Sequence, residues 1–289
     1  MNKIPNILTV DVEDWFHICA LDNGNGNVGI WNKYESRVVS NTERILSILK
    51  SNNTNATFFF LGWVAEQYPQ LVVRTKGEGH EIATHGYAHK LVYEQSPEEF
   101  LADLNKSVEI IENITKSKVI GNRSAGFSIT EKTPWAFEMI TKAGLQYDST
   151  VFPASRGHGG LVGAERNIHI IKTSQGSIQE FPISIINVFG QDVAFSGGGY
   201  LRLYPYWFIK SSIARLNKKG IPAVVYLHPR DLDTTQPRMK MPFKRRFKSY
   251  VNISTTENKV KSLLCDFNFV SIKEVIKMEE AEKSMFKSL

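Results

Sequence analysis

Short apolar runs alternate with amphipathic stretches along most of this chain. Runs rich in β-branched and aromatic residues predict strands, whereas an apolar repeat every three to four residues predicts helices. The runs that predict strands are residues 6–10, 56–61, 80–84, 118–121, 168–171, 178–181, 223–227 and 269–270. The stretches that predict helices are residues 41–50, 63–75, 97–115, 132–143, 206–216, 259–266 and a final one from residue 271. This alternation predicts an α/β fold.

Local signals sharpen this pattern. The continuously apolar run at residues 56–61 is typical of a strand buried on both faces. Ser96 at a helix cap, with Pro97 and Glu99 after it, indicates a helix start. Residues 150–205 are irregular and rich in glycine, so they predict an insertion. No repeat or linker is evident, and we expect a single domain over residues 1–289.

Composition narrows the class of protein. The 289 residues, 42% of them apolar, suffice for one α/β barrel with a substantial core. The cysteines Cys19 and Cys265 lie far apart and form no disulfide framework, which fits a reducing compartment. The net charge of +6 points only weakly to an anionic partner, and nothing indicates nucleic-acid binding.

The first residues, MNKIPNILTVDVEDWF, predict a strand and not a secretory signal, because the apolar run before Asp11 is too short. No window is long and apolar enough to predict a membrane span. We therefore expect a cytoplasmic enzyme.

Three carboxylates, Asp11, Glu13 and Asp14, stand at the end of the first predicted strand. Active sites of α/β barrels lie at the carboxyl ends of the strands. Carboxylates crowded in this way repel one another unless a cation or a shared proton intervenes. The cluster is therefore either a solvated acidic turn or part of a metal site.

His85 and His89 are four residues apart, and a helical turn would place both rings on one side. The pattern is not that of zinc proteases, since Gly86 and Tyr87 occupy the interior positions. Alone, two surface histidines would explain it, but with a strand-end carboxylate the pair forms a His-His-carboxylate set for a divalent metal. His17, near the acidic cluster, is expected at the surface.

His228 ends the apolar strand at residues 223–227 and suits a general acid. Arg123 and Asp148 also follow predicted strands. Each of these residues alone is more often structural. Because several polar residues stand at successive strand ends, we expect them to face one opening.

The order of these motifs resembles the NodB-homology polysaccharide deacetylases, carbohydrate esterase family 4. The segments that carry the resemblance are TVDVEDWFH, ATFFFLGWVAEQYP, GHEIATHGYAH, YDSTVFP, SGGGYLRLYP and YLHPRD. They resemble in particular the bacterial branch associated with exopolysaccharide loci. The resemblance implies a distorted seven-stranded (β/α) barrel with a Gly-rich insertion, a core at about residues 5–231 and a C-terminal extension at 232–289. It also implies a divalent metal, with Zn²⁺ as the expected ion, and removal of N-acetyl groups from a sugar in a glycan or glycan precursor.

The resemblance implies a catalytic role for four residues. Asp11 matches the base that deprotonates the attacking water, and His228 matches the acid that protonates the leaving amine. Arg123 matches the arginine that orients the base, and Asp148 matches the carboxylate that tunes the acid histidine.

Four further residues match the metal motif and the acetyl pocket. His85 and His89 match the two histidine ligands. The backbone of Tyr87 is expected to help hold the oxyanion, and Leu227 matches the apolar residue that lines the pocket for the acetyl methyl group.

The chain departs from the family pattern where Val12 follows Asp11, because the usual second aspartate is missing. The carboxylate ligand is then Glu13 or Asp14. An extended chain would bring in Glu13, whereas a tight turn would bring in Asp14, which we slightly prefer.

Two other departures lie near the predicted substrate groove. Ala125 replaces the usual proline two residues after the arginine, and the following Gly126-Phe127-Ser128 reshapes the groove, where Phe127 is a candidate for stacking on a sugar ring. Arg230 and Asp231 add a charged pair beside the acid histidine. Arg230 either contacts an acidic sugar or pairs with Asp231.

The basic run at residues 238–248 interleaves cations with apolar residues. It is either a solvated loop or a contact for an anionic glycan, a lipid-linked pyrophosphate or an anionic membrane face. The predicted partner is thus an N-acetylated glycan or a lipid-linked precursor, with peripheral membrane contact as an option. Two other hypotheses are a metal-free or non-sugar amide hydrolase, and a non-catalytic glycan-binding protein.

Overall fold

The computed structural model describes residues 4–17, 28–155 and 159–287. Cys19 lies outside the described residues. Cys265 is exposed and carries a free thiol.

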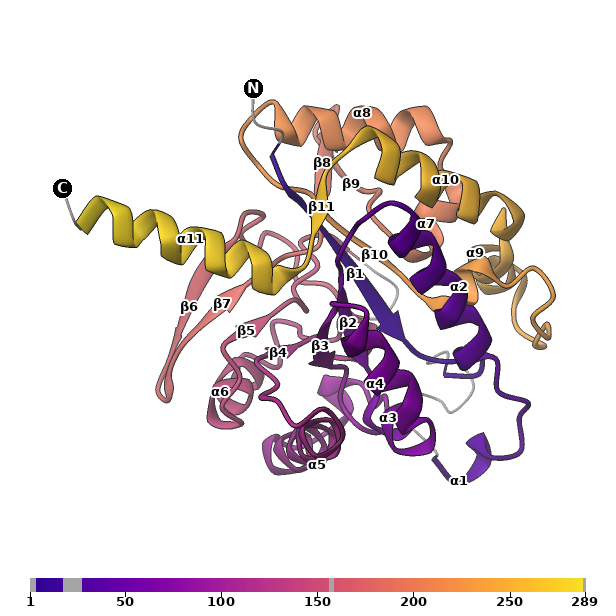
Figure 1. Ribbon diagram of the computed structural model, residues 1–289, viewed down its shortest axis with the longest axis horizontal. Coiled ribbons are helices and arrows are strands. Elements are labelled where there is room, and N and C mark those ends of the chain that lie inside the picture. Colours follow the sequence, from indigo (N-terminus) through magenta and orange to yellow (C-terminus); the bar gives the residue numbers. More distant parts are fainter. Residues whose placement is uncertain (1–3, 18–27, 156–158, 288–289) are drawn as a thin grey trace.

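A curled sheet of mostly parallel strands forms the centre of the molecule (Figure 1). Its strands run in the order β10-β1-β2-β3-β4-β5-β7-β6, and β11 pairs with β1. The strands of this sheet are β1 (Asn6–Val12), β2 (Thr57–Phe60), β3 (Glu81–Thr84), β4 (Gly121–Asn122), β5 (Tyr147–Asp148), β6 (His169–Thr173), β7 (Gly176–Glu180), β10 (Val224–Leu227) and β11 (Phe269–Val270). The path from β10 to β7 is parallel, and β6 joins its end in antiparallel fashion. The predicted α/β fold, a distorted (β/α) barrel, is confirmed, and its sheet curls into a half-barrel.

Helices surround this sheet. They are α1 (Val28–Trp31), α2 (Val38–Ser51), α3 (Gly62–Gln67), α4 (Pro69–Gly77), α5 (Pro97–Thr115), α6 (Trp135–Lys142), α7 (Gly198–Leu203), α8 (Tyr206–Asn217), α9 (Phe243–Tyr250), α10 (Ile253–Asp266) and α11 (Ile272–Lys287). None of the helices in the described ranges is long and apolar enough to cross a bilayer.

Alternation along the buried strands sorts side chains into two layers. On β2, Phe58 and Phe60 join the large cluster that includes Leu46 of α2 and Leu104 of α5, so they face the helices. Phe59, between them, joins a second cluster inside the curl of the sheet with Tyr147 and Tyr226. The same alternation decides which residues of the other strands face the site.

Several predicted elements agree with the structure, and others differ for local reasons. The helix at 97–115 begins with the predicted capping box, in which Ser96 and Glu99 each accept a bond from the other's backbone N–H. The helix predicted at 63–75 is instead two helices, because Pro69 lacks an N–H and restricts Tyr68 before it.

The insertion contains more structure than the sequence indicates. The predicted strands at 168–171 and 178–181 form the β6–β7 hairpin. A second hairpin, β8 (Ile185–Val188) with β9 (Gln191–Ala194), and the short helix α7 are additional. The basic run is partly helical, because residues 243–250 form α9.

Candidate metal and catalytic site

Polar side chains from several strands meet at the carboxyl ends of the parallel sheet. Asp11 lies in β1, His85 follows β3, Arg123 follows β4 and His228 follows β10. These positions place them on the inner side of the sheet, the face that also carries Phe59 and Tyr226, since Asp11 pairs with Phe59 and Thr9, two residues earlier, pairs with Tyr226. Asp11, His85 and His228 line one cavity of about 450 Å³.

Glu13, His85 and His89 can hold a metal ion. One ligand atom from each lies within 4.8 Å of those of the other two, and all three residues are buried. Nε2 of His89 is 2.6 Å from Oε2 of Glu13. Nδ1 of His85 is 2.6 Å from the carbonyl oxygen of Arg123, which leaves its Nε2 for an ion. Two imidazoles and one carboxylate fit a divalent ion such as Zn²⁺, with positions left for water or substrate.

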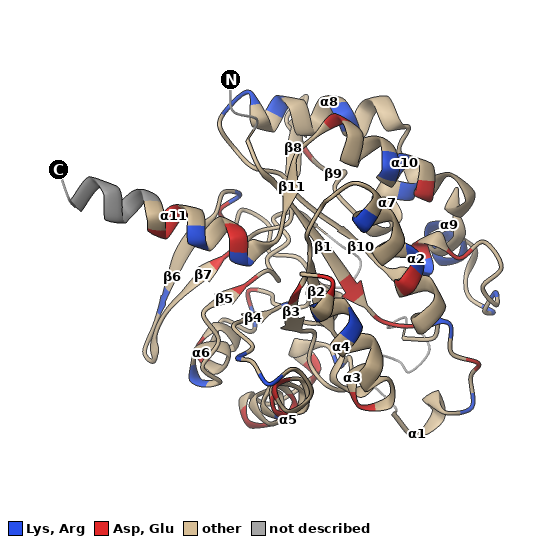
Figure 2. Ribbon diagram, viewed as in Figure 1, with Lys and Arg blue, Asp and Glu red and all other residues tan. Residues whose placement is uncertain are grey.

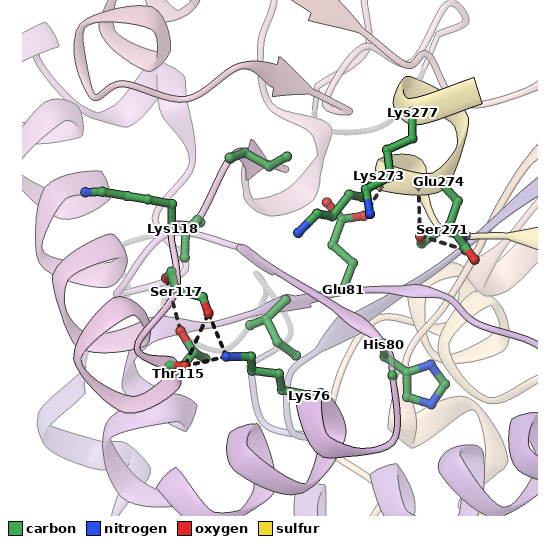
Figure 3. A pocket seen from close by; sticks show the side chains of 14 residues that line it. Lys76, His80, Glu81, Thr115, Ser117, Lys118, Ser271, Lys273, Glu274 and Lys277 are labelled. Atoms are coloured by element: carbon green, nitrogen blue, oxygen red, sulfur yellow. Dashed lines mark hydrogen bonds between the residues drawn. The ribbon is translucent and has the colours of Figure 1, made fainter. Parts of the chain in front are cut away.

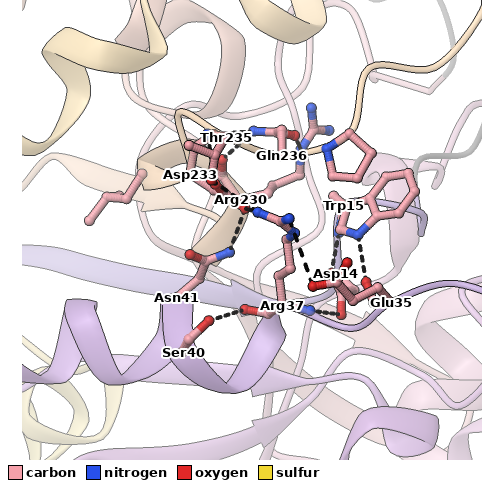
Figure 4. A network of polar contacts seen from close by, with 12 residues as sticks. Asp14, Trp15, Glu35, Arg37, Ser40, Asn41, Arg230, Asp233, Thr235 and Gln236 are labelled. Carbon is pink, nitrogen blue, oxygen red and sulfur yellow. Dashed lines mark hydrogen bonds and ion pairs between the residues drawn. The ribbon is translucent and has the colours of Figure 1, made fainter.

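Asp14 has a different role, which corrects the slight preference for it as the ligand. Its Oδ2 accepts hydrogen bonds from Oγ of Ser36 (2.6 Å) and from the backbone N–H groups of Arg37 (2.9 Å) and Val38 (3.1 Å). Its Oδ1 accepts a bond from the N–H of Trp15 (2.8 Å). Asp14 thus fastens the segment after β1 to the start of α2 (Figure 4), and Glu13 is the carboxylate near the histidines.

The loop between the histidines is not the expected helical turn. Gly86 (φ +72°) and His89 (φ +50°) have left-handed backbone conformations, and the segment is irregular. The N–H groups of Tyr87 and Ala88 donate to the Asp103 carboxylate of α5 at 2.7 and 3.0 Å. A half-buried acid of a neighbouring helix therefore fixes the loop that brings the two histidines together.

His17 is buried, so the expectation of a surface histidine is wrong. Its Nδ1 accepts the backbone N–H of Asp14 at 2.9 Å, and its ring packs against Trp31 and Trp63. Burial lowers the pKa of His17 well below its ordinary value. The ring stays neutral and supports the chain that carries Glu13.

Arg123 holds the Asp11 carboxylate in one position. Its Nη1 donates to Oδ1 of Asp11 and to Oγ1 of Thr9, each at 2.7 Å, while Nε and Nη2 donate to the Ser149 carbonyl and hydroxyl. The guanidinium is fully buried. Oδ2 of Asp11 lies on the other side of that carboxylate, 3.8 Å from Nε2 of His228. This oxygen is placed to accept a proton.

Asp231, and not Asp148, is the carboxylate beside His228. Its Oδ2 is 3.0 Å from Nδ1 of His228 and also accepts the backbone N–H of that residue at 2.9 Å. Its Oδ1 accepts from Arg202. Asp148 instead accepts hydrogen bonds from Asn122 and Thr150, and shares one with Glu180. The expected role of Asp148 is therefore corrected by the geometry.

The electrostatic environment favours metal binding. Burial raises the pKa of Glu13, but His89, His228 and His85 outweigh it and hold that pKa well below its usual range. Burial also lowers the pKa of His85, against the opposing charge of Asp11. Side chains must be deprotonated to bind a metal, and Glu13 and His85 are deprotonated at neutral pH.

Burial lowers the pKa of His228 to about 4, although the nearby Glu13 and Asp11 act in the opposite direction. An imidazolium with a lowered pKa is a stronger acid. Nδ1 faces Asp231, so Nε2, toward the cavity, is the nitrogen that can exchange a proton with a substrate, and it must take up a proton before it can donate one because the ring is neutral at neutral pH.

The cavity wall corrects two predicted substrate contacts. Phe127 and Tyr226 line it, whereas Leu227 packs on the helix side of β10, as alternation requires. The Tyr87 N–H is occupied by Asp103 and its carbonyl by the N–H of Trp63, so its backbone cannot hold an oxyanion. The Tyr87 hydroxyl donates to Glu66, away from the site.

The sequence interpretation paired Asp231 with Arg230 and missed its contact with His228, and it did not single out Tyr226. Asp231 stands three residues after His228, which is the spacing of a capping box, and this signal could have identified it. Tyr226 contacts the Gly-rich segment so closely that a Cβ on Gly197 would lie 2.2 Å from its ring. The glycine run therefore serves the approach of α7 to β10 beside His228.

A second cavity, of about 280 Å³, lies at the opposite end of β3 (Figure 3). Its lining includes Lys76, His80, Glu81, Lys273 and Glu274. In the described part of the chain, this lining contains none of the predicted catalytic or metal-binding residues.

Comparisons with known families divide the chain into two parts. Residues 26–147 match the polysaccharide deacetylase family model, and residues 149–277 match a domain of unknown function (DUF3473). A peptidoglycan-N-acetylglucosamine deacetylase from Bacillus cereus is 38% identical over 87 residues, which are 30% of this chain and 28% of that protein. The chain thus matches less than a third of this relative's length.

Solved structures share the fold. One from Mycobacterium smegmatis, described as a polysaccharide deacetylase by inference, has a TM-score of 0.64 and 17% identity, over 98% of this chain and 93% of that one. A carbohydrate esterase family 4 pseudoenzyme from Bacillus anthracis has a TM-score of 0.52 and 16% identity, over 94% of this chain and 65% of that one. At these identities the likeness shows the fold alone.

Proposed function

Because the comparisons support the polysaccharide deacetylase family for this chain, we propose that it is a metal-dependent hydrolase that removes N-acetyl groups from a sugar. The observation that carries this proposal is the convergence of three groups in one cavity. These are the Glu13, His85 and His89 set, the Asp11 carboxylate held by Arg123, and the His228 imidazole held by Asp231. A base and an acid on either side of a metal site are what amide hydrolysis requires.

Each side chain has a place in the proposed reaction. A divalent ion bound by Glu13, His85 and His89 would polarise the acetamide carbonyl and acidify a water. Oδ2 of Asp11 accepts the proton of the attacking water, while Arg123 holds Oδ1 and keeps the carboxylate in position. Nε2 of His228 donates a proton to the amine as the C–N bond breaks, and acetate is released. Phe127 and Tyr226 form the aromatic wall on which a sugar ring packs.

The finer features of the proposal follow the resemblance. We propose Zn²⁺ as the ion, since two imidazoles and a carboxylate are typical of zinc hydrolases. We also propose that the substrate is a glycan or lipid-linked precursor in exopolysaccharide biosynthesis. A cytoplasmic location stays a prediction.

Two substitutions test the assignment. His85→Ala removes a ligand, so we expect loss of both bound metal and acetate release. Asp11→Asn leaves the ligands in place, so we expect normal metal content with turnover reduced by about 10²–10⁴-fold, the usual contribution of a general base. Metal content is measured by elemental analysis, and acetate release is measured on N-acetylated chitooligosaccharides.

Full activity of Asp11→Asn would remove Asp11 as the base. A chelated protein with undiminished turnover would favour the metal-free hydrolase. A protein that binds metal and oligosaccharide without releasing acetate would favour the non-catalytic glycan-binding alternative.

A further inference from the structure

Arg230 is a buried cation in the wall of the candidate active site. It follows His228 on the turn at Pro229–Leu232, and its side chain lines the same cavity as Asp11, Glu13 and His228. Only 8% of the residue is exposed. A charge removed from water in this way is costly unless an opposite charge compensates it.

The partners of Arg230 are neutral. Its Nε donates to the side-chain oxygen of Gln236 at 3.3 Å (Figure 4). Its Nη2 donates to the carbonyl of Ser249 at 3.0 Å. Among the residues that the structure describes, no carboxylate lies within ion-pair distance of this guanidinium. Hydrogen bonds to neutral acceptors hold the group in position without neutralising it.

The carboxylates near Arg230 already have other partners. Asp231, the sequence neighbour that could have paired with Arg230, binds Arg202 and His228 instead. Asp233 pairs with Arg37, and Asp14 accepts its bonds from the start of α2. Glu13 belongs to the set that can hold a metal. Of the two roles that the sequence allowed for Arg230, pairing with Asp231 is therefore excluded, and contact with an acidic sugar is left.

More cations surround the same cavity. Lys244, Arg245 and Lys248 of α9 line it, and none of the residues of this basic helix is buried (Figure 2). Phe247, half exposed between these cations, lines the cavity as well. One buried arginine and a rim of positive side chains beside an aromatic ring match a sugar that bears a carboxylate or phosphate.

We propose that Arg230, with Lys244, Arg245 and Lys248, forms an oxyanion-binding subsite next to the catalytic centre, so that the preferred substrate is an N-acetylated sugar carrying a carboxylate or phosphate group. The planar guanidinium binds two oxygens of that group, while the cations of α9 draw it toward the cavity. This inference rests on the proposed deacetylase function, and it gives that function a substrate class.

Three substrates test the subsite by acetate release. Tetra-N-acetylchitotetraose is neutral, a tetrasaccharide of alternating glucuronate and N-acetylglucosamine carries carboxylates, and UDP-N-acetylglucosamine carries phosphates. Arg230→Gln should lower kcat/KM for an anionic substrate by about tenfold relative to the neutral one, the size expected for a lost charged hydrogen bond. Comparison of the glucuronate-containing tetrasaccharide with UDP-N-acetylglucosamine shows whether the subsite prefers a carboxylate or a phosphate.

Variants on the surface and away from the cavity complete the test. Lys244→Gln combined with Lys248→Gln alters only exposed side chains, and should lower kcat/KM for the anionic substrate by about two- to threefold in low salt. Arg74→Gln is the matched control, since Arg74 is exposed on α4 and pairs with Glu43 and Glu78. This control should leave kcat/KM unchanged for both the neutral and the anionic substrates.

Binding separates this inference from the proposed function. Calorimetry with the same three compounds is performed on metal-loaded Asp11→Asn, with and without Arg230→Gln. If no compound releases acetate from the wild type but Arg230→Gln still weakens binding of the anionic one, the deacetylase proposal fails and the subsite stands. If chitotetraose is deacetylated and Arg230→Gln affects all compounds equally, or none, the subsite is wrong and the deacetylase proposal stands.

Discussion

Asp231 both orients the His228 imidazole and neutralises a buried positive charge. Oδ2 of Asp231 faces Nδ1 of His228, and its Oδ1 accepts from Arg202. One carboxylate thus fixes the imidazole and balances a buried guanidinium. Since Nδ1 is held in this way, Nε2 is the nitrogen that exchanges a proton with the substrate.

We expect Asp231→Asn to lower kcat by about 10–100-fold with little change in KM, the usual effect of losing the partner that orients a functional histidine. Loss of the negative charge also disfavours the imidazolium, so the alkaline limb of the kcat–pH profile should move to lower pH. Steady-state kinetics on chitotetraose across the pH range measures both effects.

Asp148→Asn is the comparison, because the family resemblance assigns this role to Asp148 while the structure places it with Asn122, Thr150 and Glu180. A larger loss of kcat, or a larger shift of the pH profile, in Asp148→Asn than in Asp231→Asn would reverse our assignment. Circular dichroism and metal content verify that both variants fold.

At the scale of secondary-structure elements, the ends of β5 and β7 bring two buried carboxyl groups together. Asp148 ends β5, Glu180 ends β7, and the two strands pair in register. Burial, and then the charge of Asp148, raises the pKa of Glu180 well above its ordinary value. Because Asp148 and Glu180 share a hydrogen bond, one of them retains a proton in the folded protein.

This pair predicts a pH-dependent stability. The folded state holds a proton that the unfolded chain releases above the ordinary carboxyl pKa of 4.5. The stabilisation from that proton is complete below this pH and is lost as the pH rises toward the folded pKa. Gln at 180 donates to Asp148 without titrating, so Glu180→Gln should gain stability over the wild type as pH rises, by up to about 1.4 kcal/mol per pH unit.

Urea unfolding at pH 4.5, 6 and 8, in the presence of a chelator, measures this difference. Glu109→Gln, at an exposed position of α5, is the control and should show a constant difference from the wild type. A Glu180→Gln protein that loses stability equally at every pH would mean that the pair carries no extra proton.

Elements with strong local signals were predictable from the sequence, and those that depend on tertiary contact were not. Ser96 and Glu99 define the start of α5 by themselves, and the apolar run of β2 could be only a buried strand or helix segment. In contrast, α7 begins in a glycine run that becomes ordered only against Tyr226. The His85–His89 loop likewise depends on Asp103, a residue of another element that spacing cannot reveal.

At the scale of the whole molecule, the candidate metal site joins distant parts of the chain. Glu13 follows β1, whereas His85 and His89 follow β3, and all three are buried. An ion bound by them links the first strand to the third in the folded state only. Such binding stabilises the whole fold by RT ln(1 + [metal]/Kd), which is about 2.7 kcal/mol at a hundredfold excess over Kd.

Zinc should therefore raise the melting temperature of the chelated protein, and the variants at 13 and 14 should respond differently. Glu13→Gln removes a ligand, so zinc should no longer raise its melting temperature. Asp14→Asn weakens the bonds to Ser36, Arg37 and Val38, so the protein without metal should lose about 1–3 kcal/mol. Its response to zinc should nevertheless remain that of the wild type, because Asp14 does not face the ion.

Calorimetric scans with zinc and with chelator measure both the response to zinc and the stability of the protein without metal. If Asp14→Asn lost the response to zinc while Glu13→Gln kept it, the ligand would be Asp14, and the chain after β1 would have to turn differently when metal binds.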